Sequence, residues 1–92
     1  MATHILIIDD EKAIRKTIRE ILEYENYKVS EAENGIDGLN RMKEETCDLI
    51  LLDIKMPKMD GMEVLDEIIK HHNEVPVIMI SGHATVDIAV DA

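Results

Sequence analysis

Three aspartates follow runs of aliphatic residues, and this placement could serve chemistry. Asp9 and Asp10 come directly after HILII (residues 4–8), and Asp53 comes directly after LILL (residues 49–52). An unpaired buried charge costs roughly several kcal/mol unless a partner or a metal ion lies beside it. We therefore expect these acids either to face water at the ends of strands or to be held there for a reaction.

Carboxylates that meet at one place favour a hard metal ion. Like charges raise one another's pKa unless a cation neutralises them. The candidate ligands are all oxygens, which suits Mg²⁺ better than zinc. A carboxylate beside Mg²⁺ can attack a phosphoryl group and form an aspartyl phosphate, while the ion offsets charge on the phosphoryl oxygens. Asp53 is thus a candidate phosphate acceptor.

The same residues also have structural interpretations. An Asp ahead of a helix is most often an N-cap, and this would explain Asp9 or Asp10 alone. The pair together with Asp53 favours a site, because perturbed acids cluster at functional sites. Ser81 offers a hydroxyl to a phosphoryl oxygen and Gly82 leaves room beside it, yet a Ser-Gly pair after a strand also forms an ordinary turn.

Strands and helices that would place these acids alternate along the chain. Continuous aliphatic runs at 4–8, 48–52 and 76–80 are typical of parallel strands covered on both faces, and residues 27–32 alternate like an edge strand. Aliphatic spacing between the runs predicts helices with one buried face. These faces are Ile14, Ile18, Ile21 and Leu22 in the first helix, Ile36, Leu39 and Met42 in the second, and Leu65, Ile68 and Ile69 in the third.

Capping residues mark where these helices begin. The second helix is expected to start after Asn34, and Asp60 with Glu63 gives the third a start like a capping box. Residues 84–92 are expected to open a fourth helix. Pro57 and the Asp60-Gly61 pair form the loop before the third helix, and this loop can also border the site.

The order of elements predicts an α/β fold. Alternating strands and helices require a doubly wound parallel sheet, with right-handed crossovers and helices on both faces. Such sheets have their sites at the carboxyl ends of the strands, where the strand order reverses. If the first and third strands are neighbours, Asp9, Asp10 and Asp53 converge at one rim of the sheet.

Composition sets the remaining bounds. The 92 residues suit a single domain, 1–92. A net charge of −10 opposes binding to nucleic acid or to an anionic membrane. Cys47 is the sole cysteine, no secretory signal or apolar run of membrane-spanning length is present, and a cytoplasmic location is expected. The histidines are expected at the surface or at strand edges, with only His83 near the rim of the pocket.

Three segments together resemble a known family. ILIIDDE, LILLDIKMPKMDG and PVIMISGHA closely resemble the receiver domain of bacterial two-component response regulators, and each closes a predicted strand. The segment SGHA is similar to the corresponding segment of receivers that control transcriptional activators with an ATPase domain. The resemblance covers the whole chain and implies a flavodoxin-like sheet in the order 2-1-3-4.

The resemblance also implies roles for particular residues. Asp53 would accept a phosphoryl group from the phosphohistidine of a sensor histidine kinase. Asp10 would bind Mg²⁺ directly, Asp9 would assist through water, and the backbone carbonyl of Lys55 would complete the protein ligands. Ser81 would turn its hydroxyl toward the phosphoryl group. Such a domain takes part in its own phosphorylation and is not an enzyme acting on an outside substrate.

One departure from the family pattern concerns the carboxyl-terminal part. Receivers of this kind have five strands and five helices, whereas this chain ends in its expected fourth helix, so the fifth strand, the fifth helix and the lysine that contacts the phosphoryl group are not in the sequence. We expect an exposed edge at Pro76–Ile80 that promotes self-association. Mg²⁺ binding is expected to survive better than phosphoryl transfer.

Two other functional classes compete with this interpretation. A Mg²⁺-dependent phosphatase that uses Asp53 as nucleophile would need a general acid two residues later, where this chain has Lys55. A module that has lost signalling and serves assembly through its open edge would leave the acids idle. Titration with Mg²⁺ separates this last class from a working receiver.

Overall fold

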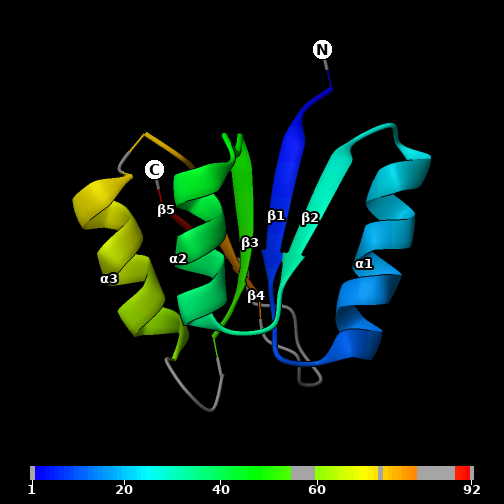
Figure 1. The fold of residues 1–92 in the computed structure, drawn as a ribbon. Helices are drawn as coiled ribbons and strands as arrows, with labels where there is room; N and C mark the ends of the chain where they lie inside the picture. Colours follow the sequence, from blue (N-terminus) through cyan, green and yellow to red (C-terminus); the bar gives the residue numbers. More distant parts are fainter. Residues whose placement is uncertain (1, 55–59, 73, 81–88, 92) are drawn as a thin grey trace.

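Strands and helices alternate from residue 4 to residue 80, as the hydrophobic pattern predicted (Figure 1). The structure is a computed structural model that describes residues 2–54, 60–72, 74–80 and 89–91. Its elements are β1 (His4–Ile8), α1 (Lys12–Tyr24), β2 (Lys28–Ala32), α2 (Gly35–Glu44), β3 (Leu49–Asp53), α3 (Gly61–His71), β4 (Val77–Ile80) and β5 (Ala89–Asp91). None of the described helices has the length and apolar character needed to cross a membrane.

The first four strands form a parallel sheet in the order β2-β1-β3-β4, which confirms the predicted order 2-1-3-4. All five residues of β1 are buried, because β1 has a strand on each side and helices cover both faces. β1 pairs with both β2 and β3, so the strand order reverses there. The carboxyl ends of β1 and β3 are therefore where a ligand site is expected.

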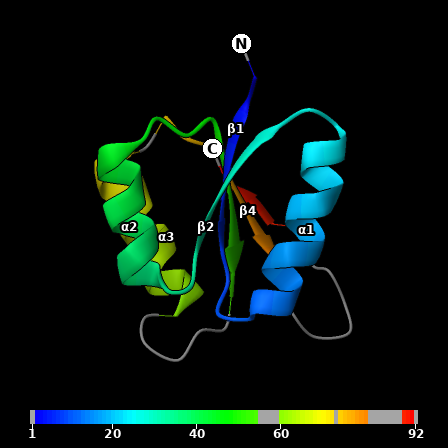
Figure 2. The ribbon, with the colours of Figure 1, turned by 45° about the vertical axis from the view of Figure 1, so that its right-hand side comes forward.

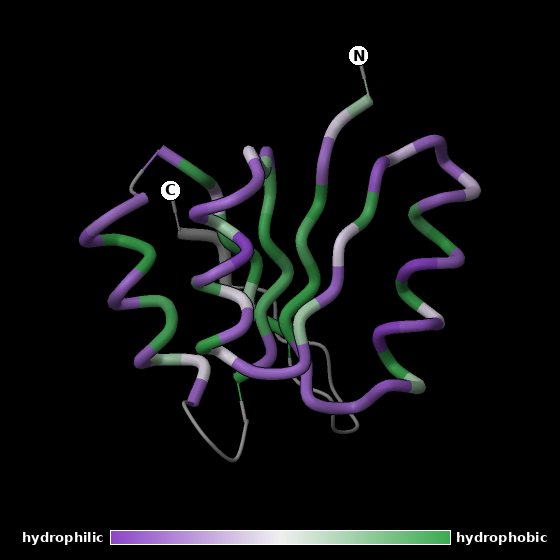
Figure 3. The backbone as a smooth tube through the Cα atoms, in the orientation of Figure 1, coloured by the Kyte–Doolittle hydropathy of each residue, from purple (hydrophilic) through white to green (hydrophobic). Residues whose placement is uncertain are grey.

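Helices cover both faces of the sheet. α1 packs on one face against β1 and β2, while α2 and α3 lie side by side on the other (Figures 1 and 2). Apolar residues concentrate in the strands, and the helices alternate between apolar and polar residues (Figure 3). The main core fills the space between the sheet and the α2–α3 pair. Its buried members are Leu6, Ile8, Ala32, Met42, Cys47, Ile50, Leu52, Val64, Leu65, Ile68, Val77 and Met79.

The face of α1 is less buried than its spacing predicted. α1 has no buried residue: Ile14, Ile18 and Leu22 are half-buried, and Ile21 is 60% exposed. The aliphatic spacing correctly identifies the side that faces the sheet. Its burial is incomplete because no second described helix lies beside α1 on that face (Figure 2).

The predicted helix starts are confirmed for α2 and α3. The side chain of Asn34 accepts a hydrogen bond from the backbone N–H of Asp37 at 2.8 Å, and that of Asp60 accepts from Glu63 at 3.0 Å. Each bond satisfies a backbone donor that has no partner within the helix. The cap of Asp60 fixes the direction in which α3 leaves the rim where Asp53 lies.

The prediction of a helix over residues 84–92 is wrong for Ala89–Asp91, which form β5. This strand pairs antiparallel with β4, and Ile78 lies opposite Val90. The backbone groups along the edge of β4 need hydrogen-bond partners, and a strand supplies them where a helix could not. The expected open edge at Pro76–Ile80 is therefore covered along Val77–Met79. No fifth parallel strand is present among the described residues.

His4 also differs from its prediction as a surface or strand-edge residue, because its side chain is buried with 6% exposure. Its Nδ1 lies 2.8 Å from the carbonyl oxygen of Thr46, and its Nε2 lies 2.7 Å from Oγ of Ser30. Its backbone N–H donates to a carboxylate oxygen of Asp48 at 2.8 Å. Burial is tolerated because both ring nitrogens have polar partners.

Candidate functional site

The three predicted acids meet at the carboxyl ends of β1 and β3. Asp9 and Asp10 directly follow β1, and Asp53 is the last residue of β3. One carboxylate oxygen from each residue lies within 4.8 Å of one from each of the others. The predicted convergence is therefore confirmed, because parallel pairing of β1 with β3 brings their last residues to one rim.

The three carboxylates differ in burial. Asp9 is fully buried, Asp53 is 4% exposed, and Asp10 is exposed to solvent. Burial raises the pKa of Asp9, and the neighbouring charge of Asp10 adds to the rise. A hydrogen bond from the backbone N–H of Glu11 to Oδ1 of Asp9, at 2.8 Å, lowers the pKa but does not cancel the effect of burial. The ionised form of Asp9 is thus held at a cost in free energy.

One buried carboxylate oxygen of this cluster lacks a hydrogen-bond partner among the described residues. Oδ2 of Asp9 is buried and has no hydrogen-bond partner in the described part of the chain. Two further carboxylates lie close enough to share an ion with it. An all-oxygen set of ligands with one solvent-exposed member fits Mg²⁺, which keeps several waters and prefers carboxylates. The residues present therefore fit a Mg²⁺ ion on their chemistry.

Backbone contacts hold Asp53 at the end of β3. The N–H of Ile54 donates to the carbonyl of Ile80 at 3.0 Å, and the carbonyl of Ile54 accepts from the N–H of Gly61 at 2.8 Å. A Cβ on Gly61 would collide with the carbonyl oxygen of Asp53 and would lie 2.6 Å from Cα of Ile54. The start of α3 therefore lies directly against the backbone of the candidate phosphate acceptor.

Arg15 is a site residue that the sequence did not reveal. Its Nη1 donates to the carbonyl oxygen of Asp9 at 2.7 Å, and its Nε donates to Oε1 of Glu31 at 3.0 Å. In the sequence it looked like one of several charges on the polar side of a helix. Its position in the first turn of α1, close to the acids, was the available signal.

The other predicted site residues lie outside the described residues. These are Lys55, Pro57, Ser81, Gly82 and His83. Their roles as ion ligand, phosphoryl contact and pocket rim remain predictions.

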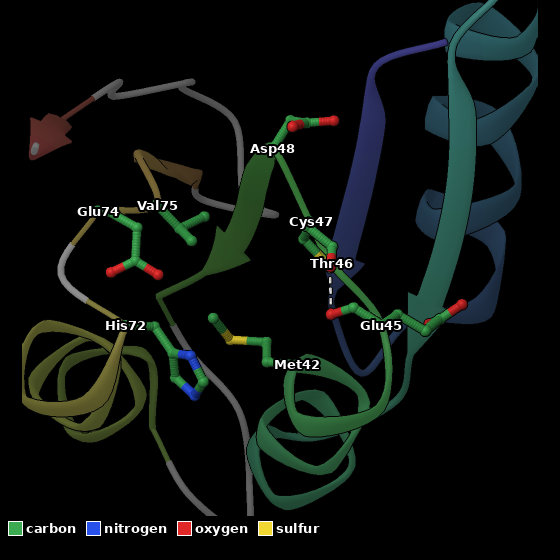
Figure 4. Close-up of a pocket in the computed structure, with 8 residues that line it drawn as sticks. All are labelled: Met42, Glu45, Thr46, Cys47, Asp48, His72, Glu74 and Val75. Atoms are coloured by element: carbon green, nitrogen blue, oxygen red, sulfur yellow. Dashed lines mark hydrogen bonds between the residues drawn. The ribbon is translucent and has the colours of Figure 1, made fainter. Parts of the chain in front are cut away.

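A separate cavity of about 340 Å³ lies at the opposite end of β3, beside Asp48 and Val75 (Figure 4). The cavity contains none of the three acids. The buried thiol of Cys47 contributes to its lining, with Sγ 4.0 Å from the carbonyl oxygen of Glu45. Burial raises the pKa of this thiol, and the charges of Glu45 and Asp48 raise it further. Cys47 is therefore a poor nucleophile, and its side chain packs in the buried core.

Comparison with known proteins identifies the class to which this fold and site belong. Residues 5–92 match the family described as the response regulator receiver domain. The chain belongs to this family.

Among curated relatives, the transcriptional regulatory protein ResD of Bacillus subtilis is 46% identical over 80 residues, covering 87% of this chain and 33% of ResD. The nitrogen assimilation regulatory protein NtrX of Azorhizobium caulinodans is 43% identical over 94 residues, covering 100% of this chain and 21% of NtrX. The chain thus spans a third or less of the length of these relatives.

A solved relative confirms the fold. The response regulator TrrA of Thermotoga maritima superposes with a TM-score of 0.84 and 36% identity, covering 89% of this chain and 71% of TrrA. That crystal structure holds TrrA in complex with Mg²⁺-BeF. TrrA has also been solved in complex with the histidine kinase ThkA.

Proposed function

We propose that residues 1–92 act as one receiver domain, which takes a phosphoryl group from a sensor histidine kinase onto Asp53 with the help of Mg²⁺. The observation that carries the proposal is the meeting of three carboxylates within 4.8 Å, one of them fully buried, in a member of the receiver family. The complexes of TrrA with Mg²⁺-BeF and with a histidine kinase support the choice of ion and partner.

In the proposed reaction, a carboxylate oxygen of Asp53 attacks phosphorus. The new O–P bond forms as the P–N bond of the phosphohistidine breaks, and the electron pair of that bond returns to the imidazole of the kinase. Asp10 would hold the ion directly, and Asp9 would act through a water molecule. Mg²⁺, when bound, offsets the charge on the phosphoryl oxygens. Positioning supplies most of the rate, because phosphoryl transfer needs little covalent help from the protein.

Residues outside the described part complete the proposal. The backbone carbonyl of Lys55 would be a further ion ligand, and the hydroxyl of Ser81 would donate to a phosphoryl oxygen. Gly82, His83 and Pro57 would form the rim.

The proposal describes a signalling module and not an enzyme with an outside substrate. We place it in the cytoplasm, in line with a single free cysteine. A net charge of −10 argues against direct contact of this chain with nucleic acid. Self-association through Pro76–Ile80 is not part of the proposal, because β5 pairs with that edge.

Labelling with acetyl phosphate and Mg²⁺ tests the proposal. Intact-mass measurement should show one added phosphoryl group on the wild-type chain and none on Asp53→Asn. Asp66→Asn is the matched control, since Asp66 lies exposed on α3 and its side chain pairs with Lys70 at 3.1 Å. Equal incorporation in the wild type and Asp53→Asn would remove Asp53 from the mechanism.

A further inference from the structure

The turn between β1 and α1 carries two of the three acids. No side-chain N-cap hydrogen bond stabilises this turn at the start of α1. Glu11 is the N-cap residue of α1, and its side chain makes no capping hydrogen bond. Asp9 and Asp10 therefore do not act as the N-cap that one interpretation of the sequence allowed. Oδ1 of Asp9 instead accepts from the N–H of Glu11, two residues later. This local bond orients one carboxylate but leaves the carbonyl of Asp9 to be held by something else.

Arg15 holds that carbonyl from the first turn of α1. Its Nη1 donates to the carbonyl oxygen of Asp9 at 2.7 Å, and such a short distance is typical of a hydrogen bond from a charged donor. The N–H of Asp9 is fixed from the other side by the carbonyl of Ala32, at 3.1 Å. The peptide groups on either side of Asp9 are thus tied to α1 and to β2.

Glu31 fixes Arg15 in this position. Oε1 of Glu31 accepts from Nε of Arg15 at 3.0 Å, and the two side chains are only 12% and 24% exposed. Oε2 of Glu31 accepts from Arg19 at 2.6 Å. The hydrogen bond from Arg19 lowers the pKa of Glu31, burial opposes this, and the bond from Arg15 lowers it further. The carboxylate therefore stays ionised and turns the guanidinium of Arg15 toward the turn.

We propose that Arg15, oriented by Glu31, is a positioning residue that shapes the turn at Asp9 and Asp10 for Mg²⁺. The inference rests on the proposed function. A positive charge near a cation site weakens binding of the cation, so a purely electrostatic role for Arg15 would oppose Mg²⁺. A positioning role acts in the other direction, because residues that orient metal ligands raise metal affinity. The sign of the change on removing the charge decides between the two roles.

The test compares Arg15→Met with Arg41→Met by Mg²⁺ titration, followed through backbone amide NMR shifts. Arg41→Met changes the net charge equally but lies on α2, where Arg41 faces Glu45 at 3.9 Å. We expect Arg15→Met to weaken Mg²⁺ binding about tenfold, as loss of an orienting partner typically does. Arg41→Met should stay within about twofold, because a remote surface charge is screened. Unchanged or tighter binding by folded Arg15→Met would overturn the inference.

Two further measurements keep the test decisive. If Arg15→Met does not fold, Arg15→Lys takes its place; it keeps the charge but loses the paired contacts of the guanidinium, and it should weaken Mg²⁺ binding while Arg41→Met does not. If the wild type does not bind Mg²⁺, the proposed function fails. Amide hydrogen exchange in the metal-free protein then tests the positioning role of Arg15 by itself. Faster exchange at Asp10 and Glu11 in the Arg15 variant, with no change in Arg41→Met, would support positioning. Equal rates would overturn it.

Discussion

At the scale of single residues, burial of the Asp9 carboxylate costs stability, and under the proposed function this carboxylate helps to hold a cation. Asp9 is fully buried, and its Oδ2 lacks a hydrogen-bond partner within the described residues. Buried polar atoms normally have partners, and an exception calls for an explanation in function. Under the proposed function the explanation is a Mg²⁺ ion, which would supply the missing interaction through a bound water and relieve the repulsion between neighbouring carboxylates. The metal-free protein should therefore be strained electrostatically at this residue.

Replacing Asp9 with Asn should raise the thermal stability of the metal-free protein at neutral pH. The amide oxygen can still accept from the N–H of Glu11, while the buried charge is removed. We expect the melting temperature to rise by about 4 °C or more, equivalent to about 1 kcal/mol for a domain of this size. Mg²⁺ should stabilise the wild type and have little effect on Asp9→Asn. Circular dichroism melts with and without Mg²⁺ measure both effects.

The same variant should show a defined dependence on pH. Burial raises the folded-state pKa of Asp9 above its ordinary value of 3.8, so the folded protein binds this proton more tightly than the unfolded chain. The stabilising effect of protonation is present below 3.8 and is lost as pH rises through the raised pKa. The advantage of Asp9→Asn should accordingly vanish in acid. A metal-free Asp9→Asn protein that is less stable than wild type at neutral pH would contradict this account.

At the scale of elements, the sequence predicts well wherever aliphatic residues follow one another without interruption. The continuous aliphatic runs gave β1 with its observed bounds, and β3 and β4 to within one residue. β3 extends to Asp53 because its backbone pairs with Ile80 in β4, which composition cannot reveal. Placing the acids at strand ends predicted that they meet on the condition that the first and third strands are neighbours, and β1 does pair with β3.

The failures arose where long-range partners decide the outcome. His4 is buried because Thr46 and Ser30, distant in sequence, supply partners for its ring. β5 is a strand because the edge of β4 supplies its hydrogen bonds. Arg15 belongs to the site because Glu31 on β2 turns it there. Such contacts depend on which distant segments the fold brings together. The local pattern of a single sequence does not indicate them.

The contact between α3 and β3 predicts different outcomes for two glycines. Gly61→Ala should destabilise the protein by about 2–4 kcal/mol, because its Cβ would meet backbone atoms of Asp53 and Ile54 that cannot move freely. Gly38→Ala should cost less, since its Cβ would meet side-chain atoms of Ile8 (Cδ1 at 2.5 Å and Cγ1 at 2.8 Å) and no backbone atoms, and alanine favours a helix by about 1 kcal/mol. Urea unfolding of both variants measures the difference.

The two glycine variants should also differ at the site. A shift of the backbone of Asp53 in Gly61→Ala should weaken Mg²⁺ binding, whereas Gly38→Ala should leave it near the wild-type value. Equal destabilisation by the two substitutions, with equal Mg²⁺ affinity, would show that α3 does not constrain the end of β3.

At the scale of the whole molecule, the two edges of the sheet determine whether copies associate. β2 forms one edge and carries the charged side chains of Lys28 and Glu31. β5 forms the other edge and is only 3 residues long. Short or charged edge strands disfavour pairing between chains. A net charge of −10 adds repulsion between copies. The structure therefore favours a monomer, in contrast to the association expected from an open β4 edge.

Proline at Val90 should reverse this preference. Val90 lies opposite Ile78 at the centre of the β4–β5 pairing, and proline cannot donate a backbone hydrogen bond or fit a paired strand. Val90→Pro should uncover the apolar edge of β4 and give dimers or larger species at roughly tens of micromolar, where exposed edges commonly associate. Val90→Thr retains a strand-favouring residue and should remain monomeric with the wild type. Light scattering coupled to size exclusion measures the masses. Association of the wild type to the same extent as Val90→Pro would show that β5 does not protect the edge, because the strand pairing would then make no difference to assembly.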